Sequence, residues 1–344
     1  MRLNGVELFR LFAIFGVIII HSSPFSEAFI GTVIEQLSRF GVPFFFLVSG
    51  YFFVLNVENK KEKTLDIAFR QIKKIIFIYA IWYVVYDFWS FFTVDSCSDI
   101  RLTCLVSTFK EQFQILIDEL IESNFIHLLT GGRAYHLWFL PSLAIALLLL
   151  AFSLKYNFFK IGMGGAIFLF VITLLNTPYR DTAIGIDIGI TNSRNGPFFS
   201  SIFVFLGAAI ARYQLVQSRM LASLPTAIFI CLIGFVAQYI EAEVLSMYTN
   251  NGDIISFDFI LFTIPFAVGS FLISLHFKSA NRIPGVFIFS RLTLGVYLVH
   301  VLVMRSLSHF EFIETGGVVK PILIFIVSML FAELLRRVPK WKLS

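Results

Sequence analysis

Three ionisable side chains lie in the apolar segment that opens the chain: Glu7, Arg10 and His21. On a helix, the eleven-residue spacing of Arg10 and His21 leaves about 20° between them and separates them by ~16 Å along the axis. Glu7 precedes Arg10 by three residues, which allows an ion pair. One helix face therefore carries an acid, a cation and an imidazole, and imidazole can act as a base near neutral pH. The simpler alternative is an Arg10 that reaches the membrane interface beside Glu7 and a His21 bonded to a loop.

Further polar residues interrupt apolar runs downstream. They are Ser49, Asp87, His136, Trp138, Arg291, Tyr297 and His300. Tyr297 and His300 are three residues apart and share a helix face. A single such residue is usually a helix–helix contact, and Trp138 alone is typical of an interfacial anchor. Because ionisable residues are costly in a bilayer, their accumulation favours a reaction chamber or a conduction path.

The composition defines the elements that must position these residues. Of the 344 residues, 58% are hydrophobic and 14% charged, against about 25% charged in a soluble protein. The mean hydropathy is +0.84. These values exclude a cytosolic enzyme, a secreted disulfide scaffold and a disordered chain. Long, continuous apolar runs predict an all-α membrane protein, because strands of a membrane barrel are short and alternating.

We predict about ten transmembrane helices, each with roughly 20 mostly apolar residues. They cover residues 6–24, 38–57, 75–94, 136–154, 161–177, 198–211, 226–245, 258–276, 286–304 and 319–335. An even number places both termini on one side. Of the 27 Lys and Arg residues, 17 fall on that side, which is therefore predicted to be cytoplasmic. The net charge of +5 then reflects orientation, and no nucleic-acid partner is expected.

We expect one membrane domain over residues 1–344, without a separate soluble domain. Its longest outer loop covers about 95–135, in which 105–129 has helical periodicity. That stretch could lie on the membrane surface or pack on the spans. Cys97 and Cys104 share this loop, where a disulfide is possible in an oxidising compartment. The first apolar segment lacks a clear cleavage site and is predicted to remain as a helix.

Four blocks, in order, resemble the acyltransferase-3 family of integral membrane acyltransferases. Arg10 and His21 match its R-x10-H motif. Residues 44–51 (FFFLVSGY) resemble F-F-x-x-S-G-[YF], residues 135–140 (YHLWFL) resemble H-L-W-F-L, and residues 290–300 resemble S-x-G-I-Y-x-x-H. The sequence is most similar to short O-acetyltransferases of bacterial surface polysaccharides, of the enterobacterial common antigen and O-antigen type.

The resemblance implies transfer of an acetyl group from cytoplasmic acetyl-CoA to a hydroxyl of a surface polysaccharide or lipid-linked glycan. The location would be the bacterial inner membrane, with lipids and the glycan acceptor as partners and with no metal. His21 would be the base or the acyl carrier, supported by Arg10 and Glu7.

The remaining implied roles concern the two substrates. The coenzyme phosphates would contact Arg70, Lys73 and Lys74, although positive-inside topology predicts the same residues and the family's two close arginines are not reproduced. Residues expected to bind the acceptor or to support the site are Ser49, His136, Trp138, Arg291, Tyr297 and His300.

Several alternatives stay open. A multi-helix transporter or exporter of a small acid or glycan precursor would also hold intramembrane Arg and His, although the sequence shows no pseudo-symmetric halves with broken helices. The acyl group could be larger, such as succinyl. Longer relatives carry an extracytoplasmic hydrolase-like domain; we expect none here, so transfer is direct or passes through a separate partner. The acceptor sugar and the oligomeric state are not defined.

Overall fold

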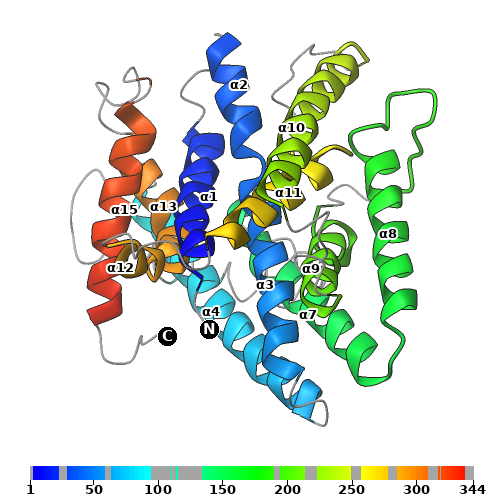
Figure 1. The fold of residues 1–344 in the computed structure, drawn as a ribbon. Helices are drawn as coiled ribbons and strands as arrows, with labels where there is room; N and C mark the ends of the chain where they lie inside the picture. The colour runs from blue at the N-terminus through cyan, green and yellow to red at the C-terminus, as the bar shows by residue number, and fades with distance from the viewer. Residues whose placement is uncertain are drawn as a thin grey trace, which may run out of the picture.

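The structure is a computed structural model of the chain. It describes residues 3–22, 29–58, 63–93, 110, 114, 134–189, 194–213, 223–248, 257–277, 285–308, 317 and 319–337. The outer loop with Cys97 and Cys104 lies almost wholly outside these residues. The described part is helical and contains no strand (Figure 1). Its helices are α1 (Asn4–Ser22), α2 (Phe29–Ser38), α3 (Gly41–Val57), α4 (Thr64–Thr93), η2 (Tyr135–Trp138), α7 (Phe139–Lys155), α8 (Phe159–Asn176), α9 (Pro197–Arg212), α10 (Leu224–Ser246), α11 (Thr263–His276), α12 (Val286–Ser290), α13 (Thr293–Leu307) and α15 (Val319–Arg337).

Each of the ten predicted ranges overlaps a helix. Within the described residues, five helical segments are long and apolar enough to cross a membrane: Asn4–Ser22, Phe29–Val57, Tyr135–Lys155, Phe159–Asn176 and Leu224–Ser246. Shorter apolar helices occur at α9, α11 and α13. The all-helical membrane class is thus confirmed, whereas the number of ten crossings stays a prediction.

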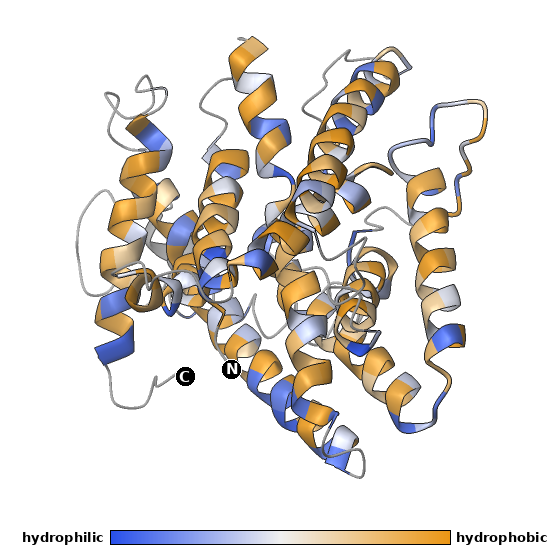
Figure 2. Cartoon of the chain, in the orientation of Figure 1, coloured by the Kyte–Doolittle hydropathy of each residue, from blue (hydrophilic) through white to orange (hydrophobic). Residues whose placement is uncertain are grey.

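Apolar residues predominate along the helices, and many polar residues gather near helix ends (Figure 2). In Figure 1, α1 begins and α15 ends at the same end of the bundle. An even number of crossings requires this arrangement. The membrane face to which that end belongs stays a prediction from the loop charges.

Two of the predicted spans contain a break between helices. The first break, at Arg39–Phe40, separates α2 from α3. Pro43 explains it, because proline has no N–H to donate to the Arg39 carbonyl and its ring clashes with that group. The second break, at Arg291–Leu292, separates α12 from α13. There the Thr293 hydroxyl donates to the Ser290 carbonyl at 2.9 Å, which satisfies an acceptor near the break.

Helix α4 begins well before its predicted span, at Thr64. Arg70, Lys73 and Lys74 therefore lie on a helix rather than in a loop, and their place on the cytoplasmic side stays a prediction. Ala68 is buried and Ile72 packs against the same core cluster, whereas the three basic residues are exposed. The helix continues past the apolar run because one face still has a packing surface.

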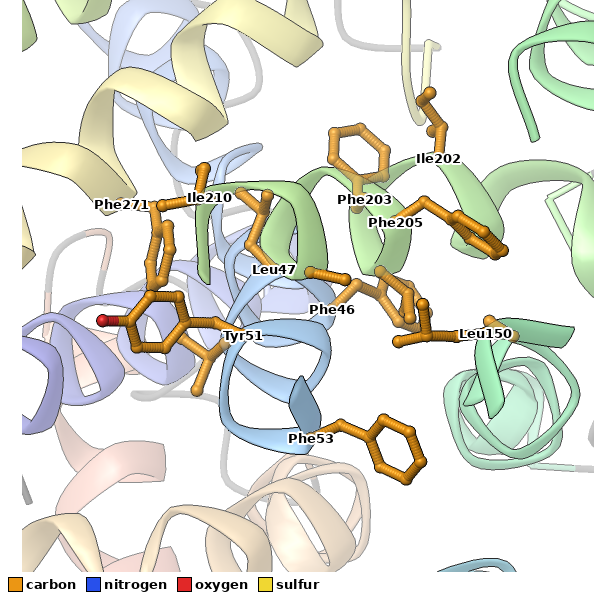
Figure 3. Packing of buried hydrophobic residues seen from close by; sticks show 14 of the residues in the cluster. Phe46, Leu47, Tyr51, Phe53, Leu150, Ile202, Phe203, Phe205, Ile210 and Phe271 are labelled. Carbon is orange, nitrogen blue, oxygen red and sulfur yellow. The ribbon is translucent and has the colours of Figure 1, made fainter. Parts of the chain in front are cut away.

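The closest helix pair is α3 with α9. A Cβ on Gly50 would lie 2.0 Å from the Val204 carbonyl oxygen, and a Cβ on Gly207 would lie 2.0 Å from the Leu47 carbonyl oxygen. Both helices therefore need a residue without a side chain where the backbones meet. Figure 3 shows the core around this crossing, with side chains from α3 and α9 in one cluster. This crossing fixes α3, which carries Ser49.

Glu241 has a structural role that the sequence did not reveal. Its carboxylate accepts hydrogen bonds from the Leu261 N–H at 2.8 Å, the Phe262 N–H at 2.9 Å, and the Tyr179 hydroxyl. Burial and this hydrogen bond raise the pKa of Tyr179. The carboxylate thus ties α10 to the segments that precede α11 and follow α8.

Candidate active site

Arg10 and Glu7 form an ion pair on the first turns of α1. Arg10 Nη1 lies 3.0 Å from Glu7 Oε1 and 3.2 Å from Oε2. Glu7 is buried, while the Arg10 side chain is 28% exposed. The pairing alone fits a structural arginine equally well. What distinguishes Arg10 is that it also lines a cavity.

That cavity, which we call the large cavity, has a volume of about 650 Å³. Its lining residues are Arg10, Val17, Val42, Phe45, Val48, Ser49, Phe139, Leu143, Ser290, Arg291, Thr293, Leu294, Tyr297 and Arg336. Arg291 and Arg336 are exposed, so the cavity reaches the surface at a basic end. The residues Val42, Phe45 and Leu143 give the remainder an apolar wall. Its volume lies in the range of ligand pockets, roughly 300–1,000 Å³.

The large cavity brings together four of the residues singled out in the sequence. Arg10, Ser49, Arg291 and Tyr297 come from α1, α3, the α12–α13 break and α13, respectively. The Ser49 hydroxyl donates to the Phe45 carbonyl at 2.7 Å, as is common for serine within a helix. Arg291 has no hydrogen-bond or ion-pair partner among the described residues and is therefore available to a ligand.

His21 lines a different, smaller cavity of about 60 Å³. This small cavity is bounded by Val17, Ile20, His21, Arg39, Val42, Pro43, Trp138, Arg194, Phe199, Asp258 and Phe259. Val17 and Val42 line both cavities. Arg10, Val17 and His21 thus follow one stripe of α1, with the large cavity at Arg10, the small cavity at His21 and Val17 shared by both.

His21 belongs to a group of three imidazoles. The rings of His21 and His300 have centroids 5.4 Å apart, and those of His300 and His136 are 5.1 Å apart. His136 and His300 are buried and line neither cavity, whereas His21 is partly exposed. Only His21 of the three can therefore meet a ligand in these cavities.

A backbone contact holds the His300 imidazole in place. The His300 Nδ1 lies 2.7 Å from the Tyr297 carbonyl oxygen. A carbonyl oxygen can only accept, so Nδ1 is the donor of this hydrogen bond. Within the described part of the chain, Nε2 has no partner. The Tyr297 hydroxyl in turn donates to the His136 carbonyl at 2.5 Å, which links α13 to η2.

A charged group beside His21 was not foreseen. It comprises Glu35, Arg39, Arg194 and Asp258, and we call it the outer charged group. The buried Arg39 lies 2.9 Å from Glu35 and 3.4 Å from Asp258, and Arg194 lies 2.5 Å from Asp258. The Arg194 guanidinium also stacks 5.5 Å from the Trp138 ring, so Trp138 holds a partner as well as lining the cavity. The i, i+4 spacing of Glu35 and Arg39 was the one available signal in the sequence.

The basic residues of α4 are not part of this arrangement. Arg70, Lys73 and Lys74 are exposed and line neither cavity. Among the described residues, no group of three or more His, Cys, Asp or Glu side chains could hold a metal ion.

Comparison with known proteins identifies the family. The profile of the acyltransferase-3 family, described as an acyltransferase domain, matches residues 3–337. No solved structure matches the chain. Two curated relatives are an "Amino-acid racemase" of Enterococcus faecalis, 27% identical over 97% of this chain and 46% of the relative, and a "Serine/alanine racemase" of Enterococcus gallinarum, 27% identical over 87% and 40%. The chain thus spans less than half the length of these relatives. Because the family profile covers nearly all of it, the chain belongs to the acyltransferase-3 family of integral membrane acyltransferases.

Proposed function

We propose that this protein is an O-acetyltransferase of the bacterial inner membrane. It would move an acetyl group from cytoplasmic acetyl-CoA to a hydroxyl of a surface polysaccharide or lipid-linked glycan. The observation that carries the proposal is the placement of His21 and Arg10 on one stripe of α1, with a cavity at each. Two substrates could approach that stripe from different directions.

The large cavity suits a donor with an anionic head and a narrow chain. Arg10, Arg291 and Arg336 offer charge-assisted hydrogen bonds to phosphate. The apolar wall beyond them would receive the pantetheine arm. The ~16 Å between Arg10 and His21 along α1 is comparable to that arm in extended form. The basic face of α4 would meet the coenzyme only where the coenzyme extends beyond the cavity.

His21 would activate the acceptor. As a base, it takes the hydroxyl proton while the oxygen attacks the thioester carbonyl; the new C–O bond forms, the C–S bond breaks, and the thiolate leaves with the proton from His21. As a nucleophile, His21 would first carry the acetyl group and then pass it to the hydroxyl. The His300 ring stacks on His21 in the same imidazole group and helps to position it.

Replacing His21 tests this assignment. The variant His21→Ala should accumulate in the membrane but leave the host glycan without O-acetyl groups, as read by NMR or mass spectrometry. The matched control is His276→Ala, because His276 ends α11 and lines neither cavity. Retained acetylation in His21→Ala, or equal loss in the control, would contradict the assignment. Purified protein with acetyl-CoA or succinyl-CoA would identify the acyl group.

A second candidate is a transporter or exporter of a small acid or glycan precursor. The breaks at Arg39 and Arg291 favour it, because broken helices commonly form transport sites. Flux of labelled substrate into proteoliposomes without acetyl transfer would support it. The racemase names of the relatives lead to no proposal of racemisation, because less than half of each relative aligns with this chain.

A further inference from the structure

The outer charged group has no net charge. Two carboxylates, from Glu35 and Asp258, face two guanidinium groups, from Arg39 and Arg194. A ligand that binds here therefore need not bring a charge of its own. The side chains of Arg39 and Glu35 are 6% and 8% exposed, so this buried pair has a structural role.

The other half of the group is open to a ligand. Asp258 is 49% exposed and bridges both arginines, and Arg194 is 23% exposed. A carboxylate can accept several hydrogen bonds, so Asp258 keeps acceptor capacity beyond its two arginine contacts. Asp258 and Arg194 together present a hydrogen-bond acceptor and a donor side by side, next to the indole of Trp138. This combination complements adjacent hydroxyl groups on a ring with an apolar face.

The size of the small cavity limits what reaches His21. Its volume of about 60 Å³ is far below the 650 Å³ of the large cavity. The small cavity therefore suits a small part of a ligand, such as a hydroxyl group and the carbon that bears it, and not a coenzyme. The remainder of a ligand must lie at the rim, where Asp258 and Arg194 are exposed.

We propose that the small cavity is the acceptor subsite and that it takes a hydroxyl-bearing carbon of an uncharged, hydroxyl-rich ligand such as a neutral sugar unit. Asp258 accepts a hydrogen bond from a neighbouring hydroxyl, and Arg194, held on Trp138, donates one. This assignment rests on the proposed function only for the role of His21. Binding itself needs no donor and can be measured separately.

The test is saturation-transfer NMR with the full chain in lipid nanodiscs and no acyl-CoA. The probes are neutral methyl glycosides of glucose, galactose, mannose, rhamnose and N-acetylglucosamine, together with methyl glucuronide and L-serine. At least one neutral glycoside should receive saturation. The signal should fall at least fivefold in Asp258→Asn and in Arg194→Gln, since a hydrogen bond to a charged group contributes about tenfold or more to affinity.

The matched control is Asp187→Asn, which removes an aspartate paired with Arg180 outside both cavities. It should bind like the unmodified protein, and all three variants should keep the same melting temperature within a few degrees. The assignment is overturned if no neutral glycoside binds, if methyl glucuronide or L-serine binds more strongly, or if both site variants bind normally. Glycoside binding that depends on Asp258, combined with no acetyl transfer by the unmodified protein, would reject the proposed function and leave this subsite in place.

Discussion

At the scale of single residues, two buried carboxylates in the described part of the chain each pair with an arginine close in sequence. Glu7 pairs with Arg10, and Glu35 pairs with Arg39. Removing one member of a buried pair leaves the other without compensation, at a cost of about 3–5 kcal/mol. Arg291 is different, because it lines the large cavity and has no partner among the described residues. Replacing Arg291 can therefore test ligand binding with little effect on folding.

The variant Arg291→Gln should raise the KM for acetyl-CoA about tenfold or more, since a charge-assisted hydrogen bond contributes roughly 1.5–3 kcal/mol. Stability should change little, because no hydrogen bond or ion pair of the side chain with the described residues is lost. Steady-state transfer of labelled acetyl groups measures the KM. A higher salt concentration should reduce the difference in KM between Arg291→Gln and the unmodified protein.

Lys73→Gln is the control for this prediction. Lys73 is exposed on α4 and lines neither cavity, so its KM should stay within about twofold of the unmodified protein. If Lys73→Gln weakens acetyl-CoA binding and Arg291→Gln does not, the coenzyme phosphates lie on α4, as the resemblance to the family implied.

At the scale of elements, apolar runs predicted where helices occur but not where they break or begin. Helix α2 was not predicted, because it has only 10 residues and includes the polar residues Thr32, Glu35 and Gln36. A segment of this length and polarity does not resemble a membrane span. The early start of α4 depends on a packing face rather than on hydropathy. The effect of Pro43 falls four residues earlier in the chain, at the carbonyl with which its ring clashes.

In the candidate site, too, the sequence predicts the local arrangement but not the contacts between distant segments. The stripe of Arg10 and His21 follows from helix geometry, which is local and regular. The outer charged group does not, because Arg39 and Asp258 are 219 residues apart and Arg194 and Asp258 are 64 apart. No spacing rule links residues that meet only through packing of separate helices. A single sequence therefore predicted the stripe of Arg10 and His21 but not the charged residues around it.

The crossing of α3 and α9 gives a prediction at this scale. Gly50→Ala should lower the free energy of unfolding by about 1–3 kcal/mol, the usual cost of overpacking, because the new methyl group meets the Val204 carbonyl. Gly164→Ala on α8 is the matched control. A Cβ there meets nothing within 4 Å, so the helix should be unchanged or stabilised by up to about 1 kcal/mol.

Melting of the two proteins in detergent, monitored by circular dichroism, measures the difference. Gly50→Ala should melt at a lower temperature than the unmodified protein, and Gly164→Ala at an equal or higher one. Equal melting temperatures for both variants would show that α3 and α9 are not in backbone contact at Gly50.

At the scale of the whole molecule, the proposed reaction requires the two cavities to face opposite sides of the membrane. Acetyl-CoA is cytoplasmic in the proposal, and the glycan is external. The exposed basic end of the large cavity includes Arg336 of the last helix, and that helix ends where α1 begins (Figure 1). The charge distribution of the loops predicts that this end is cytoplasmic. The function therefore depends on a topology that can be measured directly.

Cysteine labelling tests that topology with two exposed positions. Lys155 ends α7 on the predicted cytoplasmic side, and Asp187 follows α8 on the predicted outer side. In a protein whose Cys97, Cys104 and Cys231 are replaced by serine, a membrane-impermeant maleimide should label Asp187→Cys in spheroplasts. It should label Lys155→Cys only after permeabilisation. Labelling in the reverse order would place the basic end of the large cavity outside the cell, where cytoplasmic acetyl-CoA could not enter it, and a transport function would then explain Arg10 and Arg291 better than acyl transfer.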